Sequence, residues 1–283
     1  MIGFVNVNKE SGVGSTYVVN KIKKKLGQKC GHMGTLDPMA SGVLPVGVGK
    51  ASRLFDFLLD KRKTYVANFE FGRLTDTLDG LGKTVATGGR IPSIDEITRV
   101  LGRFCGEIEQ VPPNFSAKNV NGRRGYELAR AGVEFTLPPK KVVVEGITCL
   151  GRTGESTFSF RIDCRGGTYI RSLARDIAAS LGTFGTMTAL ERTASGVFNI
   201  ENSVSLGEFL ASDDVARYVT PADGVLSFPR IELDGIRAEK LLNGVYEKFS
   251  VDDGLYRVYA EGVFWGVGSV QNGILKMKAY CRE

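Results

Sequence analysis

Residues 31–45 read GHMGTLDPMASGVLP and contain one acidic side chain, Asp37, among small and apolar residues. Asp37 precedes Pro38, which disfavours the α region for the residue before it. Aspartate is a good helix N-cap and proline a good first helical residue, so one interpretation is a short helix that ends at Gly42. The other is a carboxylate nucleophile on a rigid loop whose glycines let a ligand approach closely. The pattern alone leaves both interpretations open.

Other patterns of metal or nucleotide chemistry are incomplete. Asp76 and Asp79 in TDTLDGLG lack the spacing and the closing glutamate of an EF-hand, which favours turn capping. The GVGS at residues 12–15 lacks the lysine of a P-loop and the third glycine of a dinucleotide fingerprint. The five cysteines are far apart with no C-x-x-C pair, and His32 is the single histidine. We therefore expect no disulfide framework, no zinc site, no Ser-His-Asp triad and no cofactor.

The composition indicates a globular protein with a basic excess. The 283 residues are 42% hydrophobic and carry a net charge of +6, and the pI is near 9.0. There is no apolar run near the roughly 20 residues of a membrane helix, and the start lacks a signal peptide's features, so we expect a cytoplasmic protein. Basic residues gather at 21–25, 61–63, 118–130 and 140–141. Each group alone fits a solvated surface, while four groups weakly favour a polyanionic partner.

Periodicity predicts a mixture of strands and helices. Residues 65–71 and 157–164 alternate apolar and polar side chains, which is typical of strands. Apolar stripes or capping signals predict helices at 15–27, 50–61, 93–106, 126–132 and 168–182, with Arg171 in the first turn of the last one. From about residue 228 the chain changes to short strands and glycine turns. We expect an α+β fold with a mainly antiparallel central sheet flanked by helices at 1–228, and a small β-rich module at 229–283.

Segments from the start of the chain to about residue 205 resemble the bacterial tRNA pseudouridine synthase B family. They are NKESGVGST, GHMGTLDPMASGVLPVGVGKAS, KTYVANFEFGRLTDTLDGLG, QVPPNFSAKNVNGRRGYELARAG, CRGGTYIRSLARDIAASLG and LERTASGVF. Glu10 stands where the family usually has proline. The tail GVFWGVGSV...LKMKAY is similar to the family's RNA-binding PUA module. The resemblance implies an enzyme that breaks the N-glycosidic bond of a uridine, rotates the base and rejoins it through carbon 5, without metal or cofactor.

The resemblance assigns the catalytic aspartate to Asp37, which attacks either the base ring or the anomeric carbon of the ribose. Because desolvation alone would raise the pKa of a carboxyl group, such a nucleophile needs a fixed positive partner. The resemblance assigns this role to Arg171, whose planar guanidinium suits a bidentate grip. Without the resemblance, Arg171 would be read as a solvated arginine at a helix start, where a cation gains nothing from the helix dipole.

Further roles follow from the same resemblance. Tyr65 would stack on the flipped uracil and is a candidate to take the carbon 5 proton. His32 would lie near the displaced base and help to hold the extruded conformation. Lys9 is expected to give structural support or a backbone contact rather than to transfer a proton. Tyr169 and Leu190 would line the pocket.

The substrate implied by the resemblance is the uridine at position 55 in the T-loop of many tRNAs, recognised by loop shape. Contacts to phosphates should dominate the affinity and make it depend steeply on salt. We assign these contacts to the tail module and to Lys118, Arg123, Arg124, Lys140 and Lys141. We expect a monomer that acts without a guide RNA and away from membranes. The alternatives are a guide-RNA-dependent relative in a multiprotein particle, disfavoured by the lack of charged tails, and a non-catalytic RNA-binding protein, disfavoured by the intact motif residues.

Overall fold

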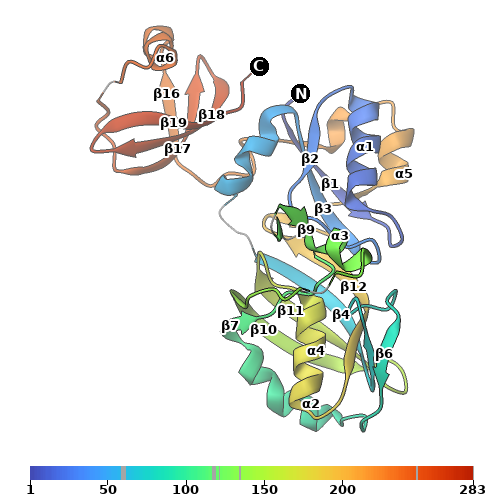
Figure 1. Ribbon diagram of the computed structural model, residues 1–283. Coiled ribbons are helices and arrows are strands. Elements are labelled where there is room, and N and C mark those ends of the chain that lie inside the picture. Colours follow the sequence, from blue (N-terminus) through green and yellow to red (C-terminus); the bar gives the residue numbers. More distant parts are fainter. Residues whose placement is uncertain (59–61, 117–118, 121, 134, 247, 283) are drawn as a thin grey trace. The chain divides into compact units, whose positions relative to one another are not determined.

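The computed structural model describes residues 1–58, 62–116, 119–120, 122–133, 135–246 and 248–282 (Figure 1). The chain divides into two compact units. Unit 1 consists of Met1–Pro38, Gly42–Asp60 and Ser195–Glu283. Unit 2 consists of Met39–Ser41 and Lys61–Ala194. Among the described residues, no helix is both long and apolar enough to cross a membrane.

Unit 1 is built around strand β1, which pairs with other strands along both of its edges. Its antiparallel neighbour β3 also pairs with β2, and the other edge of β1 pairs with β14 and β15. Helices α1 and α5 pack against each other beside these strands. The elements are β1 (Gly3–Lys9), α1 (Ser15–Leu26), β2 (Cys30–His32), β3 (Ser41–Val48), η1 (Gly49–Phe57), β13 (Phe198–Asn199), β14 (Val204–Ser205), α5 (Leu206–Ala211), η3 (Ala216–Tyr218) and β15 (Val219–Pro221).

A second sheet of four strands completes unit 1, in the order β16-β17-β18-β19. It has a core of its own that includes Leu233, Val258 and Leu275. Another buried cluster joins Phe4 and Leu54 to residues of this sheet. The elements are β16 (Arg230–Leu233), α6 (Gly235–Leu242), β17 (Gly254–Ala260), β18 (Val263–Gln271) and β19 (Ile274–Tyr280).

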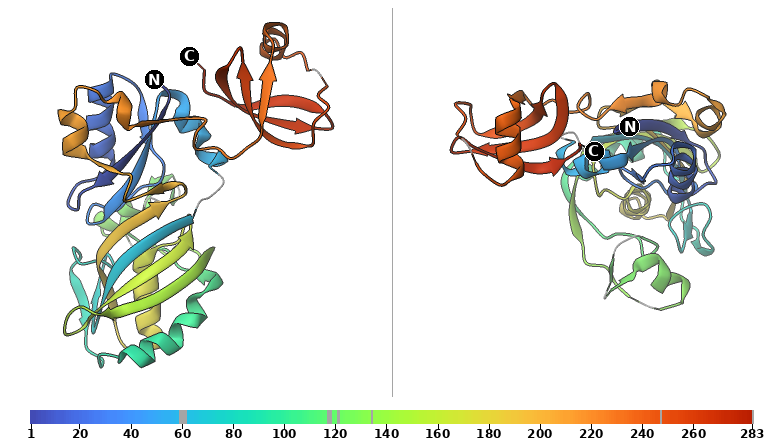
Figure 2. Two further views of the ribbon diagram at one scale, coloured as in Figure 1. Left: turned by 180° about the vertical axis from the view of Figure 1, so that it is seen from behind. Right: turned by 90° about the horizontal axis from the view of Figure 1, so that it is seen from above.

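Unit 2 is an antiparallel sheet in the order β12-β4-β11-β10-β7 with helices α2 and α4 on one face (Figures 1 and 2). Smaller pairs, β5 with β6 and β8 with β9, lie outside this sheet. The elements are β4 (Arg62–Phe71), β5 (Arg73–Thr75), β6 (Thr84–Thr87), α2 (Ile94–Leu101), η2 (Gly102–Phe104), β7 (Gly106–Gln110), β8 (Asn119–Val120), β9 (Arg123–Arg124), α3 (Gly125–Arg130), β10 (Lys140–Arg152), β11 (Thr157–Arg165), α4 (Ile170–Ser180) and β12 (Gly185–Ser195).

The predicted α+β class with mainly antiparallel sheets is confirmed, and the local signals explain why. The alternating side chains of β4 and β11 have one buried face, which includes Phe69 and Phe160 with rings 4.6 Å apart. The capping box at Ser93 starts α2 as predicted. The helix predicted at 50–61 is present as a 3₁₀ helix at Gly49–Phe57, and residues 59–61 of that prediction lie outside the described residues. Its buried Ala51 and Leu54 are three residues apart, which matches the period of that helix.

Candidate active site

Hydrogen bonds hold the chain on both sides of Asp37. The Ser15 hydroxyl donates to the Leu36 carbonyl at 2.8 Å and accepts from the Leu36 amide at 3.0 Å. The Pro38 carbonyl accepts from the Gly12 amide at 2.8 Å and from Lys9 Nζ at 3.2 Å. Asp37 itself is half-buried. The residues directly before and after Asp37 are therefore held by hydrogen bonds from the segment that runs from the end of β1 to the start of α1.

The helix-capping interpretation of Asp37 is wrong. Pro38 and Met39 form a turn, and Gly42 lies inside β3 instead of ending a helix. Gly42 has a φ of 97°, a conformation that glycine adopts without strain. The interpretation as a loop-borne carboxylate nucleophile stays a prediction.

The side chain of Lys9 is fully buried. Its ammonium donates to the carbonyls of Glu10 at 2.9 Å, Val13 at 2.7 Å and Pro38 at 3.2 Å. Hydrogen bonds of this kind, with a charged donor, are the strong ones in proteins. Because one acceptor is the residue directly after Asp37, Lys9 helps to hold the backbone of this loop in place.

His32 lies at the end of β2, opposite Val46 of β3. Its ring is half-buried, and Nε2 lies 3.5 Å from the Thr35 hydroxyl, the outer limit of a hydrogen bond. The next residue, Met33, is fixed by a backbone bond from its amide to the Pro45 carbonyl at 2.8 Å. Unit 1 thus contains Lys9, His32 and Asp37 of the predicted site.

Unit 2 contains Tyr65, Leu190, Tyr169 and Arg171. Tyr65 is 6% exposed on the buried face of β4, and Leu190 is 8% exposed on β12, the neighbouring strand. Tyr169 is half-buried at the N-cap of α4. The buried side chain of Gln110 accepts from the Tyr169 amide at 2.8 Å and donates to its carbonyl at 3.1 Å. These two hydrogen bonds, which were not predicted from the sequence, fix the start of the helix that carries Arg171.

Arg171 is buried, with 6% exposure, so it is not a solvated arginine at a helix start. Nη1 donates to the Thr77 carbonyl at 3.0 Å, and Nη2 donates to the Phe115 carbonyl at 3.1 Å. The carboxylate of Asp79 lies 3.6 Å from Nη1, and both side chains are about nine-tenths buried. The planar guanidinium is therefore anchored by at least two backbone segments and one acid.

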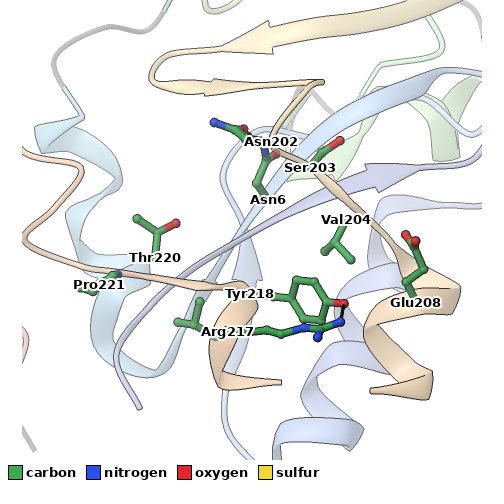
Figure 3. Close-up of a pocket in the computed structure, with 10 residues that line it drawn as sticks. Asn6, Asn202, Ser203, Val204, Glu208, Arg217, Tyr218, Thr220 and Pro221 are labelled. Atoms are coloured by element: carbon green, nitrogen blue, oxygen red, sulfur yellow. Dashed lines mark hydrogen bonds between the residues drawn. The ribbon is translucent and has the colours of Figure 1, made fainter. Parts of the chain in front are cut away.

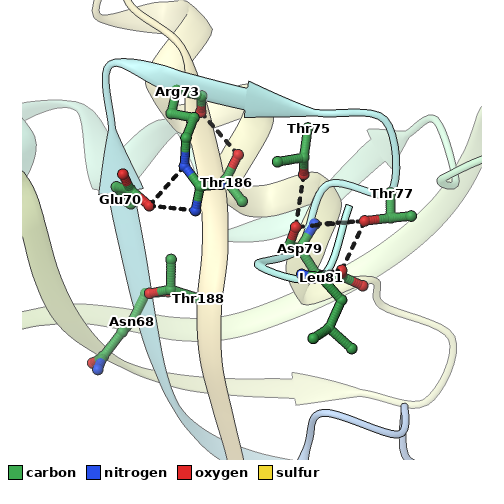
Figure 4. A network of polar contacts seen from close by, with 9 residues as sticks. All are labelled: Asn68, Glu70, Arg73, Thr75, Thr77, Asp79, Leu81, Thr186 and Thr188. Carbon is green, nitrogen blue, oxygen red and sulfur yellow. Dashed lines mark hydrogen bonds and ion pairs between the residues drawn. The ribbon is translucent and has the colours of Figure 1, made fainter. Parts of the chain in front are cut away.

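Asp79 belongs to a small polar network at the β5–β6 turn (Figure 4). Its Oδ1 accepts from the Thr77 hydroxyl at 2.7 Å and from the Leu81 amide at 3.1 Å. The Thr75 hydroxyl donates to the Asp79 carbonyl at 2.7 Å. The prediction of turn capping for Asp79 is confirmed, but its ion pair with Arg171 was not foreseen. One oxygen of this aspartate organises the turn while the other faces the guanidinium.

The environment of Lys63 is unusual for a lysine. It lies two residues before Tyr65 on β4 and opposite Cys164 of β11. Burial, with the nearby positive charge of Arg192, lowers the pKa of Lys63 to about 8. Burial also raises the pKa of the Cys164 thiol to about 11. No sequence pattern suggested a lysine with a lowered pKa two residues before the predicted stacking tyrosine.

The predicted phosphate contacts are described only in part. Lys118 lies outside the described residues, as does the side chain of Arg124, while Arg123 is exposed on β9. Lys140 and Lys141 are exposed at the start of β10. Lys141 pairs with Glu107 at 2.8 Å, and this contact raises the pKa of Lys141. Within the described residues, no three His, Cys, Asp or Glu side chains form a group that could hold a metal ion.

Comparison with known families matches most of the chain. Residues 21–170 match the N-terminal domain of the TruB family of pseudouridylate synthases. Residues 171–227 match the C-terminal domain of tRNA pseudouridylate synthase B. The chain belongs to the TruB family of pseudouridylate synthases.

Individual TruB relatives match over nearly the full length. The tRNA pseudouridine synthase B of Clostridium kluyveri is 41% identical and covers 98% of both chains. The enzyme of the same name from Aquifex aeolicus is 40% identical, covering 98% of this chain and 99% of its own. Among solved structures, a chain from a Cbf5–Nop10–Gar1 complex aligns with a TM-score of 0.72 and 25% identity, over 99% of this chain and 85% of that chain.

Most residues of the predicted site lie within the two family matches. The first match contains His32, Asp37, Tyr65 and Tyr169, and the second begins at Arg171. What the sequence reasoning missed are the supports of these residues: Ser15, Asp79 and Gln110. Each support is far from its partner along the chain, so local periodicity holds no signal for it.

Proposed function

We propose that this chain isomerises the uridine at position 55 in the T-loop of tRNA to pseudouridine, as a monomer and without a guide RNA. Relatives about 40% identical over nearly the full chain are tRNA pseudouridine synthases B. The single structural observation that carries the proposal is the loop at Asp37. Its two neighbours are fixed by Ser15, Gly12 and Lys9, as a nucleophile on a preorganised loop requires.

In the proposed reaction Asp37 attacks the base or the anomeric carbon, and the bond between N1 and the ribose breaks. The base rotates, carbon 5 bonds to the ribose, and the bond to Asp37 breaks. The proton on carbon 5 leaves, and N1 of the rotated base gains a proton. Arg171 is proposed as the positive partner that keeps Asp37 ionised. Its anchoring by Thr77, Phe115 and Asp79 supports this role, because a fixed charge needs no reorganisation during the reaction.

The other site residues receive roles that fit their surroundings. Tyr65 is proposed to stack on the extruded uracil and to take the carbon 5 proton, and Leu190 to pack against the base. His32 is proposed to hold the extruded conformation, and Tyr169 to line the pocket. Lys9 positions the loop at Asp37 and does not transfer protons.

RNA binding is assigned to exposed basic residues and to the four-stranded C-terminal sheet. Arg123, Lys140 and Lys141 are proposed to contact phosphates, together with Lys118 and Arg124. We propose that residues 229–283 form a PUA-like RNA-binding module after a catalytic domain at 1–228. The proposed tRNA substrate leads us to expect the enzyme in the cytoplasm.

The test uses the purified chain and an unmodified tRNA transcript, with no other macromolecule present. Pseudouridine is mapped by carbodiimide labelling and primer extension. We expect one new stop, in the T-loop at position 55, and none in a transcript with cytidine there. Modification that appears only after a guide RNA is added, or at a different uridine, would refute the proposal. Tight transcript binding without any modification would support the binding-only alternative.

A further inference from the structure

The exposed face of helix α1 carries only uncharged and basic side chains. The opposite face is buried in unit 1 through Ser15, Val18, Val19 and Ile22. The exposed positions of the helix are Thr16, Tyr17, Asn20, Lys21, Lys23, Lys24 and Lys25. The helix contains no acidic residue, whereas α2 carries Asp95 and Glu96 in its first turn. The charge of α1 is therefore of one sign along its last two turns.

Three of these lysines lie on the same side of the helix. Lys24 and Lys25 follow Lys21 by three and four residues, so the three side chains share one face, and we call them the lysine row. Tyr17 precedes the row by one turn, and its half-exposed ring lies 5.2 Å from the Lys21 ammonium. Lys23 lies on another side of the helix, towards β2. There burial raises the pKa of the Cys30 thiol, and the charge of Lys23 offsets part of that rise.

Within the described part of the chain, no ion pair includes a residue of the lysine row. An acid does lie on α5, the helix packed against α1, but it serves its own helix. Glu208 accepts from the Ser205 amide at 3.1 Å as part of the α5 cap, and it lines a cavity beside β1 (Figure 3). Like charges three and four residues apart repel, and only those in the last turn gain from the helix dipole. An anionic partner would neutralise this row favourably.

The lysine row lies at a short distance from the loop at Asp37. Ser15, the first residue of α1, binds both backbone groups of Leu36, at 2.8 and 3.0 Å. At a rise of about 1.5 Å per residue, Lys21 and Lys25 lie about 9 and about 15 Å along the helix from Ser15. One strand of B-form DNA carries a phosphate every roughly 3.4 Å of helix axis. A spacing of this order places several phosphates of an RNA bound at Asp37 within the span of the row.

Given the tRNA substrate proposed above, on which this assignment rests, we propose that the lysine row binds the phosphate backbone of that RNA close to the target uridine. Lysine ammonium groups are compact point charges, and contacts to phosphates carry no sequence information. The row therefore adds affinity for tRNA without reading its bases. Tyr17 assists by holding the Lys21 ammonium near its ring.

The test measures binding of the full chain to an unmodified tRNA transcript and to its isolated T-arm hairpin, by filter binding at several salt concentrations. Lys21→Gln, Lys24→Gln and Lys25→Gln each remove a charge and keep a good helix former. Each should reduce the slope of the logarithm of the binding constant against the logarithm of the salt concentration by about 1. The triple variant should bind tRNA about tenfold more weakly, or worse, at about 0.1 M salt. Weaker binding to both RNAs indicates phosphates of the T-arm, and weaker binding to the whole tRNA alone indicates phosphates of another arm.

Two controls remove the same charge outside the lysine row. Lys23→Gln changes the last turn of α1 on another side, and Arg99→Gln changes the last turn of α2 in unit 2. Both should leave the salt slope unchanged and the affinity within about twofold, and circular dichroism and urea unfolding show that every variant folds.

Two results would overturn the proposal. One is a triple variant that binds both RNAs as the wild type does, even with a lowered urea midpoint, because the row would then only stabilise the end of the helix. The other is a loss by Lys23→Gln equal to that of the row variants. Either result leaves the proposed isomerisation intact if the wild type still modifies position 55, whereas no binding of tRNA by the wild type would refute both proposals.

Discussion

Arg171→Lys keeps the positive charge but removes the planar guanidinium with its several N–H donors. The variant therefore tests whether Arg171 needs its fixed position as well as its charge. The arginine donates from two nitrogens to the carbonyls of Thr77 and Phe115, 3.0 and 3.1 Å away. The single ammonium of lysine cannot reproduce both geometries. One charge-assisted bond should be lost, and a carbonyl left without its donor, so we expect the free energy of unfolding to fall by about 2 kcal/mol.

The effect on turnover should be larger than the effect on stability. A reacting group that moves by about 1 Å can lose roughly 100-fold in rate, so we expect kcat to fall about 100-fold. The dissociation constant for tRNA should stay within about twofold, since phosphate contacts dominate it. Single-turnover assays at saturating enzyme, urea unfolding and filter binding measure the three quantities.

The matched control is Arg175→Lys, one turn further along α4. Arg175 also donates to a backbone carbonyl, that of Val111 at 3.1 Å, but it is not proposed to contact Asp37. Asp79→Asn, which removes the ion pair at 3.6 Å and keeps an oxygen for the turn, should give an intermediate loss of turnover. Wild-type turnover by Arg171→Lys, or equal losses by the two arginine variants, would refute the reasoning.

Three further predictions rest on single side chains. Lys9→Met leaves the Pro38 carbonyl without its ammonium donor, so unfolding free energy should fall by about 2–4 kcal/mol and kcat should fall with it; an unchanged urea midpoint would contradict this. Lys63 binds its proton less tightly in the folded state, so its own contribution to the unfolding free energy should rise with pH between about 8 and 10.5, by at most about 3 kcal/mol, while the raised pKa of the Cys164 thiol acts in the opposite direction above about pH 9. Lys63→Met should remove that rise in urea titrations, and parallel pH profiles would refute the lowered pKa. Arg123→Ala and Lys140→Ala should each weaken tRNA binding and reduce the slope of the logarithm of the binding constant against the logarithm of the salt concentration by about 1. An unchanged slope would show that the residue does not contact a phosphate.

The helices, strands and helix ends that depend on residues close together in the chain could be predicted from the sequence. The apolar stripe of α4 buries Ile170, Leu173 and Ile177, and the end of α1 at Gly27 takes the left-handed conformation expected of a C-cap glycine. Such signals come from residues only a few positions apart in the chain, so they can be recognised without knowledge of the fold. The same holds for the alternating strands of unit 2.

What could not be predicted are contacts between residues far apart. Asp79 and Arg171 are separated by 92 positions, and Gln110 and Tyr169 by 59. Each of these pairs depends on how strands and helices pack, which no local pattern encodes. The choice between capping and catalysis at Asp37 was open for the same reason. The turn at Pro38 and Met39 rules out the short helix, and the catalytic role of Asp37 stays a prediction.

The role of Asp37 as nucleophile is the central claim, and release of tritium from carbon 5 of labelled uridine in tRNA tests it most directly. The wild type and Asp37→Asn are compared at equal, saturating enzyme, with circular dichroism and filter binding to show that both fold and bind the transcript. We expect release by the wild type and none above background by Asp37→Asn. Release by Asp37→Asn at a rate near that of the wild type would contradict it.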